Sequence, residues 1–303
     1  MTATMHPTRR DCKSASIDPC AKINLTLEVL GHRDDGYHEI RSLAVGIDLR
    51  DGIRISLTDQ PTASITCDVK SLGGRDNLAS QAATLMASRF DLAPGIHVEV
   101  AKRIPIGAGL GGGSADAAAT IQLCNELYGL GLDPGELASL GAHIGSDVSL
   151  FFHLPSAVMS GRGEVVEAAP LHWSGWVLLV LVDEVVPTAD VYGQWQPSDR
   201  DRFPVADLSA IQAAVKADEL NALLSNHLEP AVFRVASKVC RLHGELHHRG
   251  HGPLRVSGAG SVLYKLFDEQ QAAHEAADRV DRESLGVTTM IVAAPVELTT
   301  LRK

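Results

Sequence analysis

The sequence lacks long hydrophobic runs and paired cysteines. Its longest uninterrupted apolar run, Trp176–Val182, is far shorter than the roughly 20 residues that a membrane-spanning helix needs. The 5 cysteines are scattered, odd in number and form no CxxC pair, which excludes a dense disulfide framework. Residues 1–18 are polar and contain no apolar stretch of signal-peptide length. These absences predict a cytoplasmic protein.

Basic and aromatic residues are also scarce. Lys and Arg number 27 against 37 Asp and Glu, so the net charge is −10 and the overall field repels polyanions. We therefore expect neither a nucleic acid nor an anionic membrane as the main partner. Aromatic residues make up 4%, whereas glycine is frequent, with 27 in 303 residues. That length predicts two domains, at roughly 100–200 residues each.

Hydrophobic periodicity predicts an α+β protein. Residues 21–29 alternate apolar and polar side chains, which is typical of a half-buried strand with Lys22 and Asn24 on its polar face. After residue 170 the pattern indicates a strand, helices at 208–224 and 229–247, two strands, a helix and a strand, the order of a ferredoxin-like unit. We predict two α+β domains, 1–170 and 171–303. The other predicted elements of the first domain are strands at 43–49, 53–57, 63–69 and 96–100 and helices at 77–90 and 114–128.

The glycines are concentrated in residues 107–113, where five of seven residues are glycine. Glycine lets backbone N–H groups approach a ligand with no Cβ in the way. Ser114 follows as a predicted N-cap, so the positive end of a helix dipole points at the same place. This combination is typical of a phosphate site. A mobile connector fits poorly, because a cap and a strong helix follow at once.

Three common phosphate loops do not fit this segment. A Rossmann loop needs a strand after the helix, with an acidic residue about 20 positions on. A Walker loop needs lysine before its Ser or Thr, and residue 113 is glycine. A protein-kinase glycine loop would be followed by strands and an HRD segment, which the sequence lacks.

The run Pro105-x-Gly107-x-Gly109-Leu110-Gly111-Gly112-Gly113-Ser114 resembles the phosphate loop of the GHMP kinases. Lys22 and Asn24 match the first motif of that superfamily, and the turn at 257–261 matches its third, glycine-rich motif; by itself this turn would be only a tight turn. The resemblance implies the two-domain GHMP-kinase fold. Its N-terminal domain would be ribosomal-S5-like, with the ATP phosphate loop, and its C-terminal domain ferredoxin-like.

Residues 19–38, including the run Asp35-Gly36-Tyr37-His38, are similar to the first motif of one GHMP family, the 4-diphosphocytidyl-2-C-methyl-D-erythritol kinases of the non-mevalonate isoprenoid pathway. Residues 145–152, 161–164 and 187–192 resemble the same family. The resemblance implies transfer of a phosphoryl group from ATP, with Mg²⁺, to the 2-hydroxyl of the cytidyl substrate. A kinase for homoserine or a sugar is the alternative that residues 35–38 oppose. A non-catalytic nucleotide-binding homologue is opposed by the presence of Lys22 and Asp147.

The resemblance also implies roles for individual residues. Asp147 would orient the acceptor hydroxyl or take its proton, and Lys22 would hold that carboxylate ionised. Tyr37 and Tyr192 would stack on the cytosine, and His38 would read its edge. The remaining substrate contacts implied are Asn24, Asp147, Thr188, Gly258 and Gly260. The ATP contacts implied are Asn77, Pro105, Gly107, Gly109, Leu110, Gly111, Gly112, Gly113 and Ser114.

Each of these residues also has a purely structural interpretation. Asp147 could cap a turn, and Lys22 could be a solvated strand lysine. Tyr37 could be a turn residue, Tyr192 a surface ring, and Asn77 a helix cap.

Four positions depart from the usual family pattern: Cys20, Ala115, Ser149 and His227. The first three are small replacements beside the charged groups, so we expect activity to survive; histidine at 227 removes a common acid. The histidines at 243–251 are predicted to form a solvated helix end rather than a metal site. Mg²⁺ would be carried by the phosphates, with Ser114 as a candidate contact. A monomer and a homodimer both remain open.

Overall fold

The structure, a computed structural model, describes residues 13–60, 62–282 and 289–296. The chain forms two compact units, and neither is continuous in sequence. Unit 1 comprises residues 1–19, 50–103 and 112–152, and unit 2 comprises 20–49, 104–111 and 153–303. This division differs from the single boundary predicted near residue 170. The strand at 38–50 pairs with the strand at 156–161, and this pairing places an early segment in the later unit.

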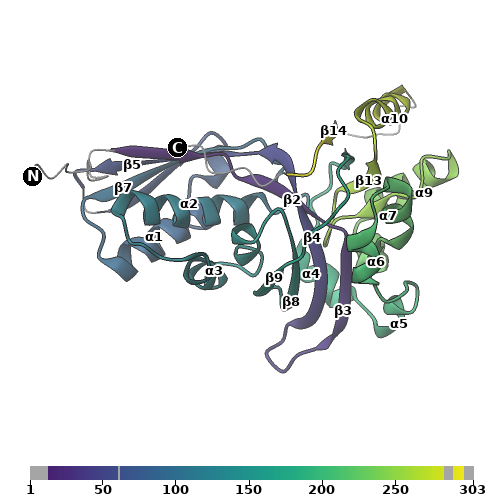
Figure 1. Ribbon diagram of the computed structural model, residues 1–303, viewed down its shortest axis with the longest axis horizontal. Helices are drawn as coiled ribbons and strands as arrows, with labels where there is room; N and C mark the ends of the chain where they lie inside the picture. The colour runs from purple at the N-terminus through teal and green to yellow at the C-terminus, as the bar shows by residue number, and fades with distance from the viewer. Residues whose placement is uncertain (1–12, 61, 283–288, 297–303) are drawn as a thin grey trace, which may run out of the picture. The chain divides into compact units, whose positions relative to one another are not determined.

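Unit 1 is a four-stranded sheet with helices on one face. The strand order is β1-β5-β7-β6, with β6 and β7 parallel. Figure 1 shows α1 and α2 running along one face of this sheet. The elements are β1 (Ser14–Ile17), β5 (Gly52–Thr58), β6 (Ala63–Cys67), η2 (Lys70–Leu72), α1 (Leu78–Phe90), β7 (Gly95–Ala101), α2 (Gly112–Tyr128), α3 (Pro134–Ala142) and η3 (Ser149–Phe152).

Helix α2 begins at Gly112, two residues before the predicted start. The prediction that Ser114 is the N-cap is therefore wrong, and Ser114 lies within the first helical turn. Glycine can adopt the helical conformation as well as loop conformations, so its presence at 112 and 113 is compatible with a helix that extends back into the loop. The first four N–H groups of a helix have no intrahelical acceptor, so residues 112–115 present such groups at the end of the glycine segment. Alanines at 115 and 117–119 are buried, and those at 117–119 belong to the apolar core of unit 1.

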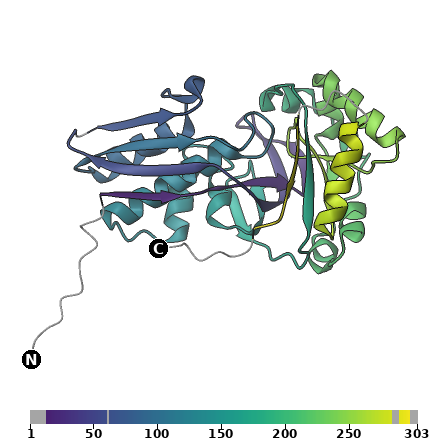
Figure 2. The same cartoon turned by 90° about the horizontal axis from the view of Figure 1, so that it is seen from above.

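Unit 2 contains two sheets. One has the order β12-β13-β10-β14 with antiparallel neighbours, which confirms the predicted ferredoxin-like unit. Figure 2 shows α10, in yellow, lying along this sheet. The other has the order β11-β3-β4-β8-β9, and β2 also pairs with β4. The strands are β2 (Cys20–Asn24), β3 (Thr26–His32), β4 (His38–Arg50), β8 (Ser156–Gly161), β9 (Val165–Ala168), β10 (Trp176–Leu181), β11 (Ser225–Asn226), β12 (Arg255–Val256), β13 (Leu263–Phe267) and β14 (Thr289–Ala293).

Seven helices of unit 2 connect and cover these strands within the described residues. The predicted helix at 208–224 is divided in two, as is the predicted helix at 229–247. The helices are α4 (Thr188–Gln194), α5 (Pro197–Arg200), α6 (Leu208–Ala213), α7 (Ala217–Leu223), α8 (Glu229–Val235), α9 (Ser237–His248) and α10 (Gln270–Arg282).

The strand predicted at 21–29 is two strands, β2 and β3, separated by a bend at Leu25. The prediction that it is half-buried is wrong, because every residue from 20 to 29 is buried. Lys22 is only 4% exposed and Asn24 only 6%. The alternating pattern is real, but the polar side chains are covered by other segments of unit 2. The interpretation of Lys22 as a solvated strand lysine is therefore also wrong.

Candidate active site

Lys22 and Asn24 begin a buried chain of hydrogen bonds in unit 2. The Lys22 ammonium donates to Asn24 Oδ1 at 2.7 Å, and Asn24 Nδ2 donates to Ser42 Oγ at 2.8 Å. The Asn24 backbone N–H donates to Ser257 Oγ at 3.2 Å, and the Tyr264 hydroxyl donates to the Asn24 carbonyl at 2.8 Å. A buried ammonium is costly unless its hydrogen bonds are satisfied. The network therefore holds the Lys22 head group in one orientation.

Residues 104–111 are the part of the glycine-rich loop that belongs to unit 2, and we call them the glycine segment. This segment packs on strand β2 and on the turn at 257–261. The Lys22 N–H donates to the Leu110 carbonyl at 2.9 Å, and the Val262 N–H donates to the Ala108 carbonyl at 3.2 Å. A Cβ on Gly109, whose φ is +78°, would lie 2.7 Å from the carbonyl oxygens of both Ser257 and Gly260. This position therefore requires glycine for space as well as for conformation. The structure brings these three predicted segments together.

The turn at 257–261 closes over Lys22 and Asn24. A Cβ on Gly258 would lie 3.1 Å from Asn24 Oδ1 and 3.5 Å from Lys22 Nζ. Buried Asn226, which sequence reasoning did not assign to the site, donates from Nδ2 to the carbonyls of Val256 and Gly258 at 2.9 and 2.8 Å. Asparagine provides two donors on one nitrogen, so a single side chain holds both sides of the turn.

The departure at residue 227 has a structural explanation. His227 is 1% exposed, and its Nδ1 accepts a hydrogen bond from the Val29 N–H at 3.2 Å. Burial lowers the pKa of His227, which favours the neutral ring that can accept this bond. Histidine at this position therefore anchors the segment after β11 to β3.

The remaining predicted nucleotide residues lie in unit 1. Ser114 is half-buried in the first turn of α2, and Gly113 is exposed beside it. Asn77 caps α1: its Oδ1 accepts from the Ala79 N–H at 2.8 Å, and its Nδ2 donates to the Leu72 carbonyl at 2.8 Å. The helix-cap interpretation of Asn77 is confirmed, and its contact with a nucleotide stays a prediction.

Asp147 lies in a turn between α3 and η3 of unit 1. The turn is closed by the Val148 N–H, which donates to the Gly145 carbonyl at 3.1 Å, and Asp147 is half-buried. Ser149, where proline is common, donates from Oγ to the Ala138 carbonyl at 2.8 Å and so anchors the turn to α3. Lys22 belongs to unit 2, so its pairing with Asp147 stays a prediction.

A buried charge cluster at the start of α2 escaped sequence reasoning. The Lys102 ammonium contacts the carboxylates of Asp51 and Asp116, the latter at 2.8 Å, and the three side chains are 6%, 0% and 2% exposed. Burial raises the pKa of Asp116 to about 7, against the opposing effect of Lys102. Burial lowers the pKa of Lys102, but the two carboxylates outweigh this effect and the net pKa is raised. Asp116 Oδ1 is buried and has no hydrogen-bond partner among the described residues.

The predicted base-binding residues gather around His38 in unit 2. His38 begins β4, opposite His32 of β3, and its ring lies 5.0 Å from that of Tyr192. Tyr37 is 51% exposed and carries the Arg162 guanidinium 5.0 Å from its ring centre. Sequence reasoning did not assign base-binding roles to Arg162, His32 or Trp195. Thr188, another predicted contact, is the exposed first residue of α4.

The histidines at 243–251 have different environments. His247 and His248 are exposed, as predicted, whereas His243 is partly buried against Phe233 at 4.8 Å and its Nε2 lies 3.2 Å from the Leu254 carbonyl. In the part of the chain that the structure describes, no group of three or more His, Cys, Asp or Glu side chains could hold a metal ion. No helix in that part is long and apolar enough to cross a membrane.

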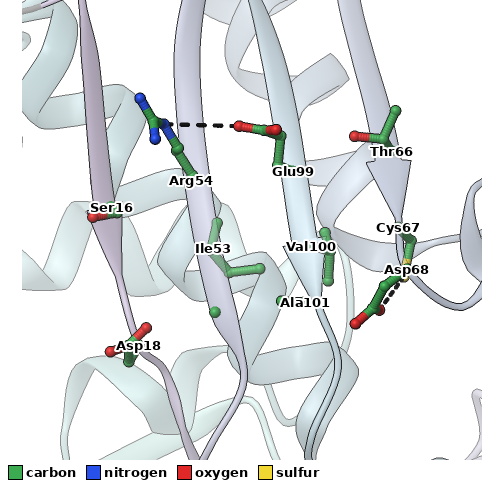
Figure 3. A pocket seen from close by; sticks show the side chains of 11 residues that line it. Ser16, Asp18, Ile53, Arg54, Thr66, Cys67, Asp68, Glu99, Val100 and Ala101 are labelled. Carbon is green, nitrogen blue, oxygen red and sulfur yellow. Dashed lines mark hydrogen bonds and ion pairs between the residues drawn. The ribbon is translucent and has the colours of Figure 1, made fainter.

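A shallow hollow of about 550 Å³ lies on the open face of the unit 1 sheet (Figure 3). Arg54 and Glu99 pair across neighbouring strands at 3.7 Å, and Asp18 and Asp68 also line the hollow. None of the predicted site residues lines it. It is therefore distinct from the candidate site.

Known proteins have sequences similar to this chain. Residues 77–154 match the family model described as "GHMP kinases N terminal domain". A 4-diphosphocytidyl-2-C-methyl-D-erythritol kinase of Geobacter sp. (strain M21) is 38% identical over 263 residues, 86% of this chain and 92% of its own. The enzyme of that name from Shouchella clausii (strain KSM-K16) is 36% identical over 258 residues, 84% of this chain and 86% of its own.

Solved structures are similar to this chain as well. A crystal structure of 4-(cytidine 5'-diphospho)-2C-methyl-D-erythritol kinase superimposes with a TM-score of 0.78 at 28% identity, covering 93% of this chain and 100% of its own. Homoserine kinase from Cytophaga hutchinsonii has a TM-score of 0.71 at 15% identity, covering 94% and 95%. The second similarity is one of fold alone.

Proposed function

The chain belongs to the 4-diphosphocytidyl-2-C-methyl-D-erythritol kinases, a family of GHMP kinases, and we propose that it transfers the γ-phosphoryl group of ATP to the 2-hydroxyl of that cytidyl substrate. The products are ADP and the 2-phosphate of the substrate. This reaction belongs to the non-mevalonate route to isoprenoid precursors. The proposed compartment is the cytoplasm; the four cysteines within the described residues form no disulfide, which is compatible with a reducing environment.

ATP is the phosphoryl donor of the GHMP kinases, and the glycine segment is the part of the chain suited to its phosphates. Residues 107–111 hold their backbone in place through contacts with β2 and the turn at 257–261. Residues 112–115 follow with the N–H groups of the first turn of α2. With a net charge of −10, the protein must bind this anion through such local donors rather than through its overall field.

The transfer step depends mainly on positioning and on stabilisation of charge. The substrate oxygen forms a bond to the γ-phosphorus while the bond from that phosphorus to the β,γ-bridging oxygen breaks. We propose that Asp147 accepts or orients the hydroxyl proton and that the Lys22 ammonium stabilises the carboxylate and the transferring charge. The hydrogen bond from Lys22 to Asn24 supports this role, because it restrains the ammonium before substrate binds.

Mg²⁺ fits this site as an ion carried by the nucleotide. The described residues offer no cage of carboxylates or histidines, whereas the Ser114 hydroxyl lies in the first turn of the proposed phosphate-binding helix. Ser114 is therefore the proposed side-chain contact. The ion would neutralise charge that develops on the phosphate oxygens.

The base would be held by rings and read by His38. We propose that Tyr37 and Tyr192 supply stacking surface, which by itself is tolerant of base identity at roughly 1–3 kcal/mol per base. Discrimination must then come from hydrogen bonds, for which His38 is the candidate. Its position beside Tyr192 supports this assignment.

One observation carries the proposal: β2, the glycine segment and the turn at 257–261 meet around Lys22 and Asn24. The test is ADP release by the purified protein with ATP, Mg²⁺ and one acceptor at a time: the cytidyl substrate, homoserine or a sugar. We expect that, of these acceptors, only the cytidyl substrate supports ADP release. Release with another acceptor instead, or release that needs no acceptor, would contradict the proposal.

The Asp147→Asn variant tests the mechanism and the alternative of a non-catalytic homologue. We expect a loss of about 10²-fold or more in kcat, the range for a residue that transfers or orients a proton. The exposed Asp59→Asn is the matched control, since it removes the same charge from unit 1. Equal activity of the two variants would remove Asp147 from the mechanism.

A further inference from the structure

His38 is part of a ring cluster that extends beyond the proposed base contacts. The His32 ring centre lies 4.1 Å from that of His38 at a tilt of 47°. Trp195 meets both histidines edge-on, at 5.5 Å from His38 and 5.8 Å from His32. His32 ends β3 and Trp195 follows α4, so these two elements fix the orientation of the His38 ring from two sides.

Two nitrogens of this cluster are buried and make no hydrogen bond to any residue that the structure describes. His38 is 9% exposed, and its Nε2 has no partner among the described residues; the same is true of Trp195 Nε1. A protonated imidazole must donate from both nitrogens, whereas the neutral ring keeps one lone pair. Protonation of His38 would therefore bury an N–H with no acceptor, which costs free energy.

The environment of His38 also disfavours protonation of its ring. Burial lowers the pKa of His38, and the neighbouring His32 lowers it further. Tyr192 is the titratable group that faces it from α4, and Arg162 of the β8–β9 turn lies over the adjacent Tyr37. Two acids of the β3–β4 hairpin, Asp35 and Glu39, are engaged by Arg33.

We propose that His32 and Trp195 are positioning residues that hold His38 neutral and in one orientation, and that this arrangement sets the preference of the site for cytosine. The proposal rests on the proposed function and deepens it. A neutral imidazole provides one donor and one acceptor. The cytosine edge carries an amino donor beside ring and carbonyl acceptors, whereas uracil carries a carbonyl in place of the amino group. A charged ring has lost its acceptor and would no longer favour the amino group.

The decisive experiment is an NMR titration of His38 in the wild type and in His32→Gln, with exposed His248→Gln as the control. Gln removes the imidazole ring but keeps a polar side chain at the strand end. We expect the pKa of His38 to rise toward its ordinary 6.5 in His32→Gln and to stay unchanged in His248→Gln. An unchanged His38 pKa in His32→Gln overturns the proposal. This measurement needs no substrate, so its result is independent of the proposed function.

The kinetic readout is the KM for the cytidyl substrate at pH 6 and pH 8. His32→Gln removes only the smaller of the two causes, because His38 stays buried. If only the neutral ring binds, KM at pH 6 therefore rises in this variant by at most about fourfold, the limit for an imidazole with the ordinary pKa of 6.5. The wild type should show a smaller change in KM between the two pH values. The kcat of His32→Gln should not change in parallel with its KM. Trp195→Phe, which keeps an aromatic ring but removes the indole N–H, should retain the wild-type pH profile, whereas Trp195→Leu should not. Identical KM profiles in the wild type and His32→Gln would also overturn the proposal.

Discussion

Replacing Lys102 by methionine removes the cation from a buried cluster and leaves Asp51 and Asp116 facing each other. Both carboxylates are almost fully buried, and Asp116 Oδ1 already lacks a partner among the described residues. Removal of one member of a buried ion pair costs about 3–5 kcal/mol, because the other charge stays desolvated. Asp51 still accepts a hydrogen bond from the Arg103 N–H at 2.5 Å, which favours the lower half of that range. We therefore expect Lys102→Met to lower the free energy of unfolding by about 3 kcal/mol.

The assay is urea denaturation at pH 7.5, with Lys70→Met as the matched control. Lys70 is exposed on η2, so the same substitution there should change stability by no more than about 0.5 kcal/mol. Asp116→Asn combined with Lys102→Met should recover part of the loss, because one of the two carboxylates is then neutral. Equal stability of Lys102→Met and Lys70→Met would refute the reasoning that this cluster depends on its ammonium.

Three further predictions follow from single contacts. Asp116→Asn should change how stability depends on pH: the folded pKa of Asp116 is raised to about 7, so its contribution is present below about pH 4 and is lost as pH rises through 7. Between pH 5 and pH 8 the melting temperature should fall less in this variant than in the wild type. Gly109→Ala should destabilise the protein by more than about 1 kcal/mol and raise KM for ATP, since its Cβ would lie 2.7 Å from two carbonyl oxygens at a φ of +78°; Gly74→Ala, with open space around its Cβ, is the control. Tyr192→Ala should raise KM for the cytidyl substrate more than it lowers kcat, if stacking is equal in ground and transition states. A fall in kcat alone would contradict that assignment.

Local pattern accounted for much of the fold. The helix at 78–90 with Asn77 as its cap and the strands at 52–58 and 95–101 lie where periodicity indicated them, because each buries one apolar stripe or face. The ferredoxin-like order of unit 2 was also predicted, because its strands and helices follow one another along the chain in the order that the hydrophobic pattern indicates. The start of α2 was misplaced, because the serine that usually caps a helix lies behind two glycines that are themselves helical.

Long-range burial was not readable from local pattern. Alternation at 21–29 is typical of a strand with one wet face, and nothing near Lys22 in the sequence indicates that residues more than 200 positions away cover it. The Lys102 cluster joins residues 51, 102 and 116, each of which is an ordinary charged residue in its own segment. Trp195 and His32 escaped notice for the same reason, since ring contacts have no period along the chain.

The sequence by itself therefore determined the family, the glycine segment and most element types, because motifs and periodicity are local properties of consecutive residues. The tertiary structure decided which polar groups are desolvated and what compensates them. Lys22 is a restrained ammonium, Asp116 a buried acid and His38 a ring with a buried nitrogen only because distant segments exclude water from them. Desolvation depends on the whole surrounding volume, and that volume is assembled by folding.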